Sequence, residues 1–179
     1  MAINFYKGDL PSDIDLGKVV AIDSETMGLR PQRDRLCLVQ LSSGDGNAHL
    51  IQFEQEEYEA PNLVQLLGDP TVTEIFHYAR FDVAIIKKYL QTETKSIYCT
   101  KIASKLVRTY TDRHGLKDLC RELLNIDLSK QQQSSDWGAE DLTEEQKLYA
   151  ASDVLYLHKI KDILDSRLIR EGRYKMADD

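Results

Sequence analysis

Acidic side chains stand in positions of the sequence that otherwise read as buried. The stretch AIDSET, residues 21–26, follows two valines and reads as the end of a buried strand. Side chains two apart on a strand point the same way, so Asp23 and Glu25 share a face with Val19 and Ala21. An isolated buried carboxylate must protonate or find a partner, which makes this pair the strongest constraint on the fold.

Two predicted helices repeat the pattern. In the stretch RFDVAIIKKYL, Asp82 lies four residues before Ile86, on the same apolar stripe. In a later helix Tyr149, Asp153 and Leu157 line one side at the same spacing. No Arg or Lys occupies a matching position on these stripes, so the four acids are expected to face a common interior without a basic partner.

Divalent cations would neutralise such a group of acids. Mg²⁺ and Mn²⁺ prefer carboxylate oxygens and water, and two ions held roughly 3.5–4 Å apart can activate a water and stabilise a leaving oxygen. Taken singly, Asp23 could be an N-cap, Asp82 an exposed helix residue and Asp153 an i to i+4 partner. Taken together with Glu25 and Tyr149, the acids are interpreted as metal ligands.

The remaining pattern indicates an α/β fold with a mixed sheet flanked by helices. Residues 45–46, Asp-Gly, mark the tight turn of a hairpin between the second and third strands. Thr143 and Gln146 form a capping-box sequence, which predicts one long helix over about 144–170. No linker divides the chain, so residues 1–179 are expected to form a single domain. Five strands are expected near residues 19–25, 36–42, 49–53, 73–77 and 96–99.

The charge distribution bears on nucleic acid as a partner. A net charge of −7 argues against it, because phosphate contacts come from Lys and Arg. Residues 95–121 reverse this balance, with seven basic and two acidic residues and a local charge of +5. Lys101, Lys105 and Arg108 are expected on one face of a helix, with Ile102 on the other. Such a stripe indicates either a nucleic-acid contact or an ordinary solvated helix face.

Nothing in the sequence indicates a membrane partner. The N-terminus lacks a basic run followed by an apolar stretch. No segment approaches the roughly 20 apolar residues that a membrane helix needs. We therefore expect a cytoplasmic protein.

Three stretches carry the acids and resemble a known set of motifs. DSE at residues 23–25, FHYARFD ending at Asp82 and YAASD ending at Asp153 look like the three exonuclease motifs of the DEDD superfamily. Tyr149 stands four residues before the last Asp, and Leu148 stands where the histidine branch has its His. The chain thus resembles the tyrosine branch. The fold that this resemblance implies is ribonuclease H-like, of the DnaQ-like exonuclease type.

The similarity extends to ribonuclease D over nearly the whole chain, in stretches such as CTKIASKL, HGLKDLCRELL and SSDW. Full-length ribonuclease D also has C-terminal helical nucleic-acid-binding domains, and none is expected here because the resemblance takes up nearly all of the chain. The short chain looks most like the stand-alone nanoRNase C group, which trims very short RNAs, notably dinucleotides, and assembles as a ring-shaped homo-octamer. The resemblance therefore implies short RNA as the partner and a homo-oligomer, with the octamer as its expected form.

The reaction that this resemblance implies is 3′-to-5′ hydrolysis releasing nucleoside 5′-monophosphates, with two divalent cations, Mg²⁺ or Mn²⁺. Asp23 would bridge both ions, Asp153 would complete one site, and Asp82 would support the other through water. Glu25 would bind metal and contact the terminal 3′-hydroxyl. Tyr149 would orient the attacking water, because a tyrosine with a pKa of about 10 is a poor base at neutral pH.

Residues around the motifs are candidates for substrate contacts. Leu29 is expected as a wedge against the last bases, with Thr26 and Met27 beside it, although Met27 and Leu29 could also be core residues. His77 and Arg80 flank the second motif and could touch phosphate or base. For His77 the alternative is a hydrogen-bonded structural role.

Two later features could also bind substrate. The stretch TDRHG, residues 111–115, joins two predicted helices, and an Arg in a loop suits bidentate phosphate binding. Arg113 and His114 are therefore expected to grip the 5′ phosphate, with an ordinary solvated loop as the alternative. Trp137 could stack on a base or pack in the core.

Two other functions stay open at this point. A DNA exonuclease is one, because nothing in the sequence identifies a reader of the 2′-hydroxyl. A catalytically idle nucleic-acid-binding module is the other. It would be expected to lose the acids, and all four are present together with Tyr149.

Overall fold

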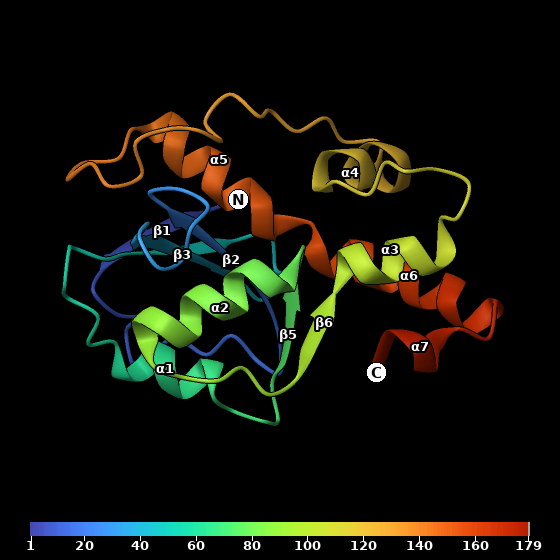
Figure 1. The fold of residues 1–179 in the computed structure, drawn as a ribbon, viewed down its shortest axis with the longest axis horizontal. Helices are drawn as coiled ribbons and strands as arrows, with labels where there is room; N and C mark the ends of the chain where they lie inside the picture. Colours follow the sequence, from blue (N-terminus) through green and yellow to red (C-terminus); the bar gives the residue numbers. More distant parts are fainter. Residues whose placement is uncertain (179) are drawn as a thin grey trace.

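A six-stranded mixed sheet runs through the centre of the molecule (Figure 1). The computed structural model describes residues 1–178. The strands are β1 Ile3–Lys7, β2 Val19–Thr26, β3 Leu36–Ser42, β4 Ala48–Gln52, β5 Thr73–Phe76 and β6 Ile97–Cys99. They follow the order β1-β4-β3-β2-β5-β6. Strand β3 runs antiparallel to β2 and β4, and the other pairs are parallel.

The expected mixed α/β sheet is confirmed, but the expected count of five strands is wrong by one. The additional strand is β1, which lies at the sheet edge and pairs in parallel with β4. Its side chains are divided between the two faces, with Ile3 and Phe5 packed on one side and Tyr6 on the other. This strand has only five residues, and its partner β4 begins at Ala48, far along the chain. The sequence around residues 3–7 alone therefore indicates a strand only weakly.

Helices cover both faces of the sheet. They are α1 Pro61–Leu67, α2 Ala79–Leu90, α3 Thr100–Val107, α4 Leu116–Leu124, α5 Glu144–Leu155, α6 Leu157–Arg170 and α7 Tyr174–Asp178. Figure 1 shows α1 and α2 together on one side of the sheet and α5 on the other. Helix α6 packs against α3 and α4. None of the helices among residues 1–178 has the length and apolar character that crossing a bilayer requires.

The predicted long helix after Thr143 is two helices. Its capping box is confirmed, because Thr143 Oγ1 accepts from the Gln146 N–H at 3.1 Å and Gln146 Oε1 accepts from the Thr143 N–H at 2.9 Å. Helix α5 ends at Leu155, and Tyr156, with φ −112° and ψ −3°, separates it from α6. The break lets α5 follow the sheet while α6 turns to pack on α3 and α4, so one helix over 144–170 is not formed.

The hairpin expected at Asp45-Gly46 is confirmed. Strands β3 and β4 pair antiparallel on either side of it. Gly46 has a φ of 87°, in the region that favours glycine, and Asp45 Oδ1 accepts from the Asn47 N–H at 2.9 Å.

The expected division of α3 into a basic and an apolar face is wrong. Arg108, directly after α3, is only 3% exposed. Its guanidinium donates to Glu122, to Ser104 Oγ at 3.0 Å and to the Arg113 carbonyl at 2.6 Å, so partners within the protein satisfy the buried charge. Ile102, placed on the apolar side by its spacing, is 53% exposed. The buried side of the helix is instead formed by Thr100, Ala103, Ser104 and Val107.

Candidate active site

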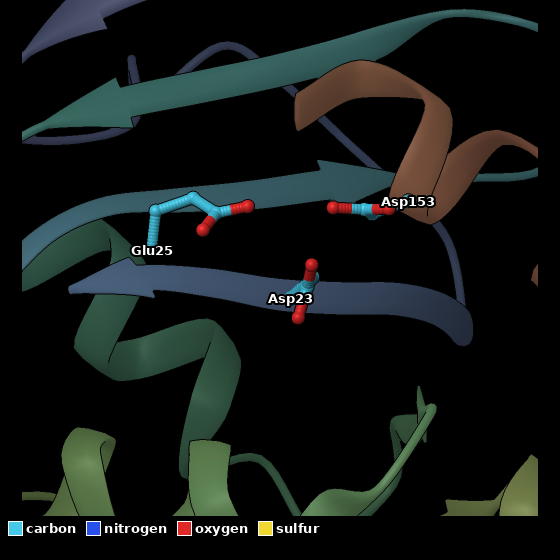
Figure 2. Close-up of side chains that lie close together, drawn as sticks. All are labelled: Asp23, Glu25 and Asp153. Carbon is cyan, nitrogen blue, oxygen red and sulfur yellow. The ribbon is translucent and has the colours of Figure 1, made fainter. Parts of the chain in front are cut away.

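Three carboxylates converge between β2 and α5. Strand β2 is paired on both sides, and its alternation turns Asp23 and Glu25 toward the same face as Ala21, which packs against α5. Asp153 comes from α5. The three residues offer carboxylate oxygens that lie within 4.8 Å of one another, and Figure 2 shows the three side chains turned toward a common centre.

The fourth acid, Asp82, reaches the site from the other face of the sheet. It lies in the first turn of α2 and is buried. Ser24 Oγ, between the two acids of β2, donates to Asp82 Oδ1 at 2.5 Å. The charges of Asp23 and Glu25 act on Asp82, which places it in the same electrostatic cluster.

Burial dominates the electrostatics of this cluster. It raises the pKa of Asp23 to about 6. It also raises the pKa values of Glu25, Asp82 and Asp153 well above their ordinary range, and the neighbouring charge of Asp23 adds to each shift. The charged forms of these groups are therefore costly in the metal-free protein.

Among the described residues no Lys or Arg forms an ion pair with these carboxylates. The donor that reaches them from β3 is an amide, since Gln40 Nε2 lies 3.4 Å from Asp23 Oδ2 and 3.3 Å from Glu25 Oε1. Crowded carboxylate oxygens without a basic partner fit a hard divalent cation. Asp23, Glu25 and Asp153 would hold it directly, and Asp82 lies next to them.

Tyr149 lies one turn before Asp153 on α5 and lines the same hollow. Burial and then the Asp153 charge raise the pKa of Tyr149 above its ordinary value, so its hydroxyl stays protonated. The Tyr149 ring packs against Trp137 with centroids 5.9 Å apart. Trp137 is 2% exposed within the core cluster of Leu38 and Leu50, a placement that favours packing over base stacking.

A hollow of about 330 Å³ opens beside the carboxylates. Asp23, Glu25, Tyr149 and Asp153 line it. The basic residues Lys101, Lys117 and Lys130 line the same hollow. The site thus offers acids for cations and, in the same hollow, ammonium groups for phosphate.

Tyr78 also lines this hollow and is half exposed. Its φ of 66° puts a non-glycine residue in the left-handed region, directly before α2. Such strained residues persist where the surroundings enforce them and cluster at functional sites. Lys101 Nζ lies 4.2 Å from the Tyr78 ring centroid, so an aromatic face and a cation are presented together.

The residues after the first motif lie outside the walls of the hollow. Leu29 is 85% exposed and Met27 is 52% exposed, so neither is a core residue. Thr26 Oγ1 donates to the Gly28 carbonyl at 2.5 Å, which shapes the turn that follows β2. Arg80 is exposed in the first turn of α2.

His77 lines the hollow and is fixed by neighbours. Its Nδ1 lies 2.9 Å from Thr100 Oγ1. Burial and the nearby Lys101 lower the pKa of His77 to about 4, so the ring is neutral at physiological pH. His77 is therefore a hydrogen-bonded structural residue that also lines the hollow.

The loop at residues 111–115 is held from inside. His114 is buried, with Nδ1 2.8 Å from Ser104 Oγ and 3.4 Å from Arg108. The Arg113 side chain is exposed and is not among the residues that line the hollow, although its carbonyl accepts from Arg108. The loop reaches the hollow at Gly115.

Several residues of the site were not singled out from the sequence. Ser24 and Gln40 contact the acids, and Tyr78 and Lys130 line the hollow. Only Gln40 carried a usable signal, because a polar residue in the otherwise apolar stretch LCLVQLS implies a buried partner. The others depend on neighbours distant in sequence.

A family model described as 3′-5′ exonuclease matches residues 9–169 of this chain. The chain therefore belongs to that family of phosphodiester hydrolases. It is similar to Brucella melitensis NrnC, for which one solved structure holds Mg²⁺ and another is bound to pGG. The pGG-bound structure is 56% identical, with a TM-score of 0.96, and the match covers 99% of this chain and 87% of that one. The Mg²⁺-bound structure is 55% identical, with a TM-score of 0.95 and the same coverage.

Ribonuclease D of Gluconacetobacter diazotrophicus is 34% identical over 154 residues, which is 86% of this chain. The chain spans 39% of the length of that curated relative. The resemblance to ribonuclease D and to the nanoRNase C group is thereby confirmed, and the fold is the ribonuclease H-like fold of these exonucleases.

Proposed function

We propose that this chain is a 3′-to-5′ exoribonuclease that uses two divalent cations, Mg²⁺ or Mn²⁺, to degrade very short RNA to nucleoside 5′-monophosphates. The observation that carries the proposal is the convergence of three carboxylates within 4.8 Å at a hollow that three lysines also line. A short substrate fits this arrangement, because a hollow of about 330 Å³ accommodates only a small part of a nucleic acid. The bound pGG of the similar NrnC supports the same substrate class.

The proposed roles follow from position. Asp23, Glu25 and Asp153 hold the cations, with Asp82 supporting them from α2. When bound, the cations acidify a water and offset the charge that gathers on the phosphate. Tyr149 keeps its proton and donates a hydrogen bond that orients the attacking water. The scissile phosphodiester lies in the hollow that the acids and the lysines line.

The substrate is held by groups around the hollow. Lys101, Lys117 and Lys130 contact phosphate oxygens. Tyr78 offers its exposed ring to a base, where stacking contributes about 1–3 kcal/mol. Leu29, with Thr26 and Met27, keeps its proposed role as a wedge, since a leucine exposed this far is free to touch a base.

Three further candidates lie away from the hollow. Arg80, Arg113 and His114 do not line the hollow in one chain. Arg113 could reach a substrate held by a second copy, in line with the proposed homo-oligomer. Light scattering of the purified protein measures that assembly directly.

The test compares the wild type with Asp23→Ala. Both are incubated with Mg²⁺ and a matched set of 5′-labelled RNA and DNA, from dinucleotides to long duplexes. We expect fast cleavage of RNA dinucleotides by the wild type alone. Preference for long DNA would keep the metal site and overturn the substrate assignment, and the absence of metal-dependent cleavage of every substrate would overturn the proposal.

A further inference from the structure

Gln146 joins the start of α5 to the turn at residues 135–138. Its side chain is buried, and Oε1 accepts from the Thr143 N–H at 2.9 Å. Its Nε2 donates to Ser135 Oγ at 2.7 Å and to the Asp136 carbonyl at 3.1 Å. One side chain therefore both caps a helix and anchors a turn.

The turn carries Trp137. The Trp137 N–H donates to the Ser135 carbonyl at 3.0 Å, and the Gly138 N–H donates to Asp136 Oδ1 at 3.1 Å. The indole is buried, yet its Nε1 has no hydrogen-bond partner in the part of the chain that the structure describes. Packing and the attachment of the turn by Gln146 therefore decide where the indole lies.

Trp137 forms the wall against which Tyr149 rests. The two rings are 5.9 Å apart and inclined by 34°. Tyr149 is one helical turn after Gln146, and Asp153 is one turn further along α5. A displacement of the turn would remove the support of the Tyr149 ring and let its hydroxyl move relative to the carboxylates.

We propose that Gln146 is a positioning residue for hydrolysis: it anchors the turn of Trp137 and thereby holds the Tyr149 hydroxyl beside the carboxylates. Gln146 is not among the residues that line the hollow, so it acts through Trp137. The catalytic part of this inference rests on the proposed function, whereas the anchoring of the turn does not. Positioning is consequential because a displacement of about 1 Å can cost about 100-fold in rate.

The variant Gln146→Glu separates capping from anchoring. Glutamate still accepts from the Thr143 N–H and is itself a capping-box residue. It also places a carboxylate against the Asp136 carbonyl, where an N–H donor is needed. The matched control is Gln65→Glu, which adds the same charge on the exposed side of α1.

The first measurement is fluorescence of the metal-free protein. Trp137 is the only tryptophan of the chain, so its emission reports the turn alone. We expect Gln146→Glu to show red-shifted emission and stronger acrylamide quenching, with unchanged far-ultraviolet circular dichroism. Gln65→Glu should match the wild type. Unchanged emission and quenching in Gln146→Glu would overturn the anchoring.

The second measurement is steady-state hydrolysis of an RNA dinucleotide. We expect kcat of Gln146→Glu to fall about tenfold or more while KM stays within about twofold, because a displaced Tyr149 affects the reaction more than binding. A purely structural role would lower the melting temperature and leave kcat per folded molecule unchanged. A red shift with wild-type kcat would overturn the positioning of Tyr149.

A second variant guards against loss of folding. Ser135→Ala removes one acceptor of the Gln146 amide and leaves the capping box intact. Compared with Gln146→Glu, it should give a smaller red shift and a smaller fall in kcat. An emission spectrum and a kcat equal to those of the wild type would count against the proposal. If the wild type hydrolyses no nucleic acid, the proposed function fails, while the fluorescence still decides the anchoring.

Discussion

Ser24 holds Asp82 across strand β2 by a hydrogen bond of 2.5 Å from its hydroxyl to Asp82 Oδ1. Its neighbours Asp23 and Glu25 point to the opposite face of the sheet, toward α5. One strand thus presents acids on one face and fastens the acid of α2 on the other. The cluster is assembled around the end of β2 from both layers of helices.

Ser24→Ala removes this hydrogen bond and keeps all four carboxylates. We expect about a 10-fold loss of activity and a higher Mg²⁺ concentration for half-maximal rate, because contacts that orient metal ligands typically contribute 10–100-fold. Initial rates against Mg²⁺ concentration check this, with the exposed Ser12→Ala as control. A Mg²⁺ dependence identical to that of the wild type would show that Asp82 needs no such support.

Asp153→Asn should stabilise the metal-free protein. It removes one of three crowded carboxylates whose pKa values burial and mutual charge raise. In chelator we expect a higher melting temperature than that of the wild type, and a smaller rise when Mg²⁺ is added. For the wild type, a ligand at 100 times its Kd adds about 2.7 kcal/mol to the free energy of unfolding.

The control for this measurement is Asp162→Asn, at an exposed position on α6. It changes the net charge equally without touching the site. A lower melting temperature of Asp153→Asn in chelator would mean that the carboxylate stabilises the fold without metal.

The acids of the site could be predicted because each interrupts an apolar period of its own element. Asp23 and Glu25 break a strand pattern, and Asp82 and Asp153 break helical ones. An acid within an apolar pattern can be recognised from its own strand or helix, without knowing which residues will contact it. The capping box of Thr143 is local in the same way, and the structure confirms it.

What could not be predicted depends on contacts distant in sequence. The edge strand β1 exists because it pairs with β4, and α5 ends at Leu155 where the packing partner changes from the sheet to other helices. Arg108 is buried because Glu122, Ser104 and a carbonyl of the next loop meet there. Its helical spacing alone indicated a solvated position.

Trp137 shows why substrate contacts are hard to predict from the sequence. Its sequence neighbours are polar, which left base stacking and packing equally open. The structure buries it behind Tyr149, through an anchor, Gln146, whose local pattern indicated only a helix cap. Side chains that line a hollow come from separate elements, so their convergence becomes visible only in three dimensions.

Tyr149→Phe should lower kcat by about 10–100-fold with little change in KM, because in the proposed mechanism the hydroxyl acts on the attacking water and not on substrate binding. Burial and the Asp153 charge raise the pKa of Tyr149, so it remains protonated across the neutral range. Deprotonation of Tyr149 should therefore not lower kcat at alkaline pH. The pH profiles of kcat for the wild type and Tyr149→Phe should have the same shape. Steady-state rates of both proteins from about pH 6 to about pH 9 check this.

Glu74, on β5, is fully buried, and neither carboxyl oxygen has a hydrogen-bond partner among residues 1–178. Burial raises its pKa from 4.5 to about 8. The folded protein thus keeps a proton that the unfolded chain releases, so the free energy of unfolding falls as pH rises across that window. Glu74→Gln removes this dependence, and its melting temperature relative to the wild type should rise from about pH 5 to about pH 8. The exposed Glu54→Gln is the control, and a difference independent of pH would contradict a buried protonated Glu74.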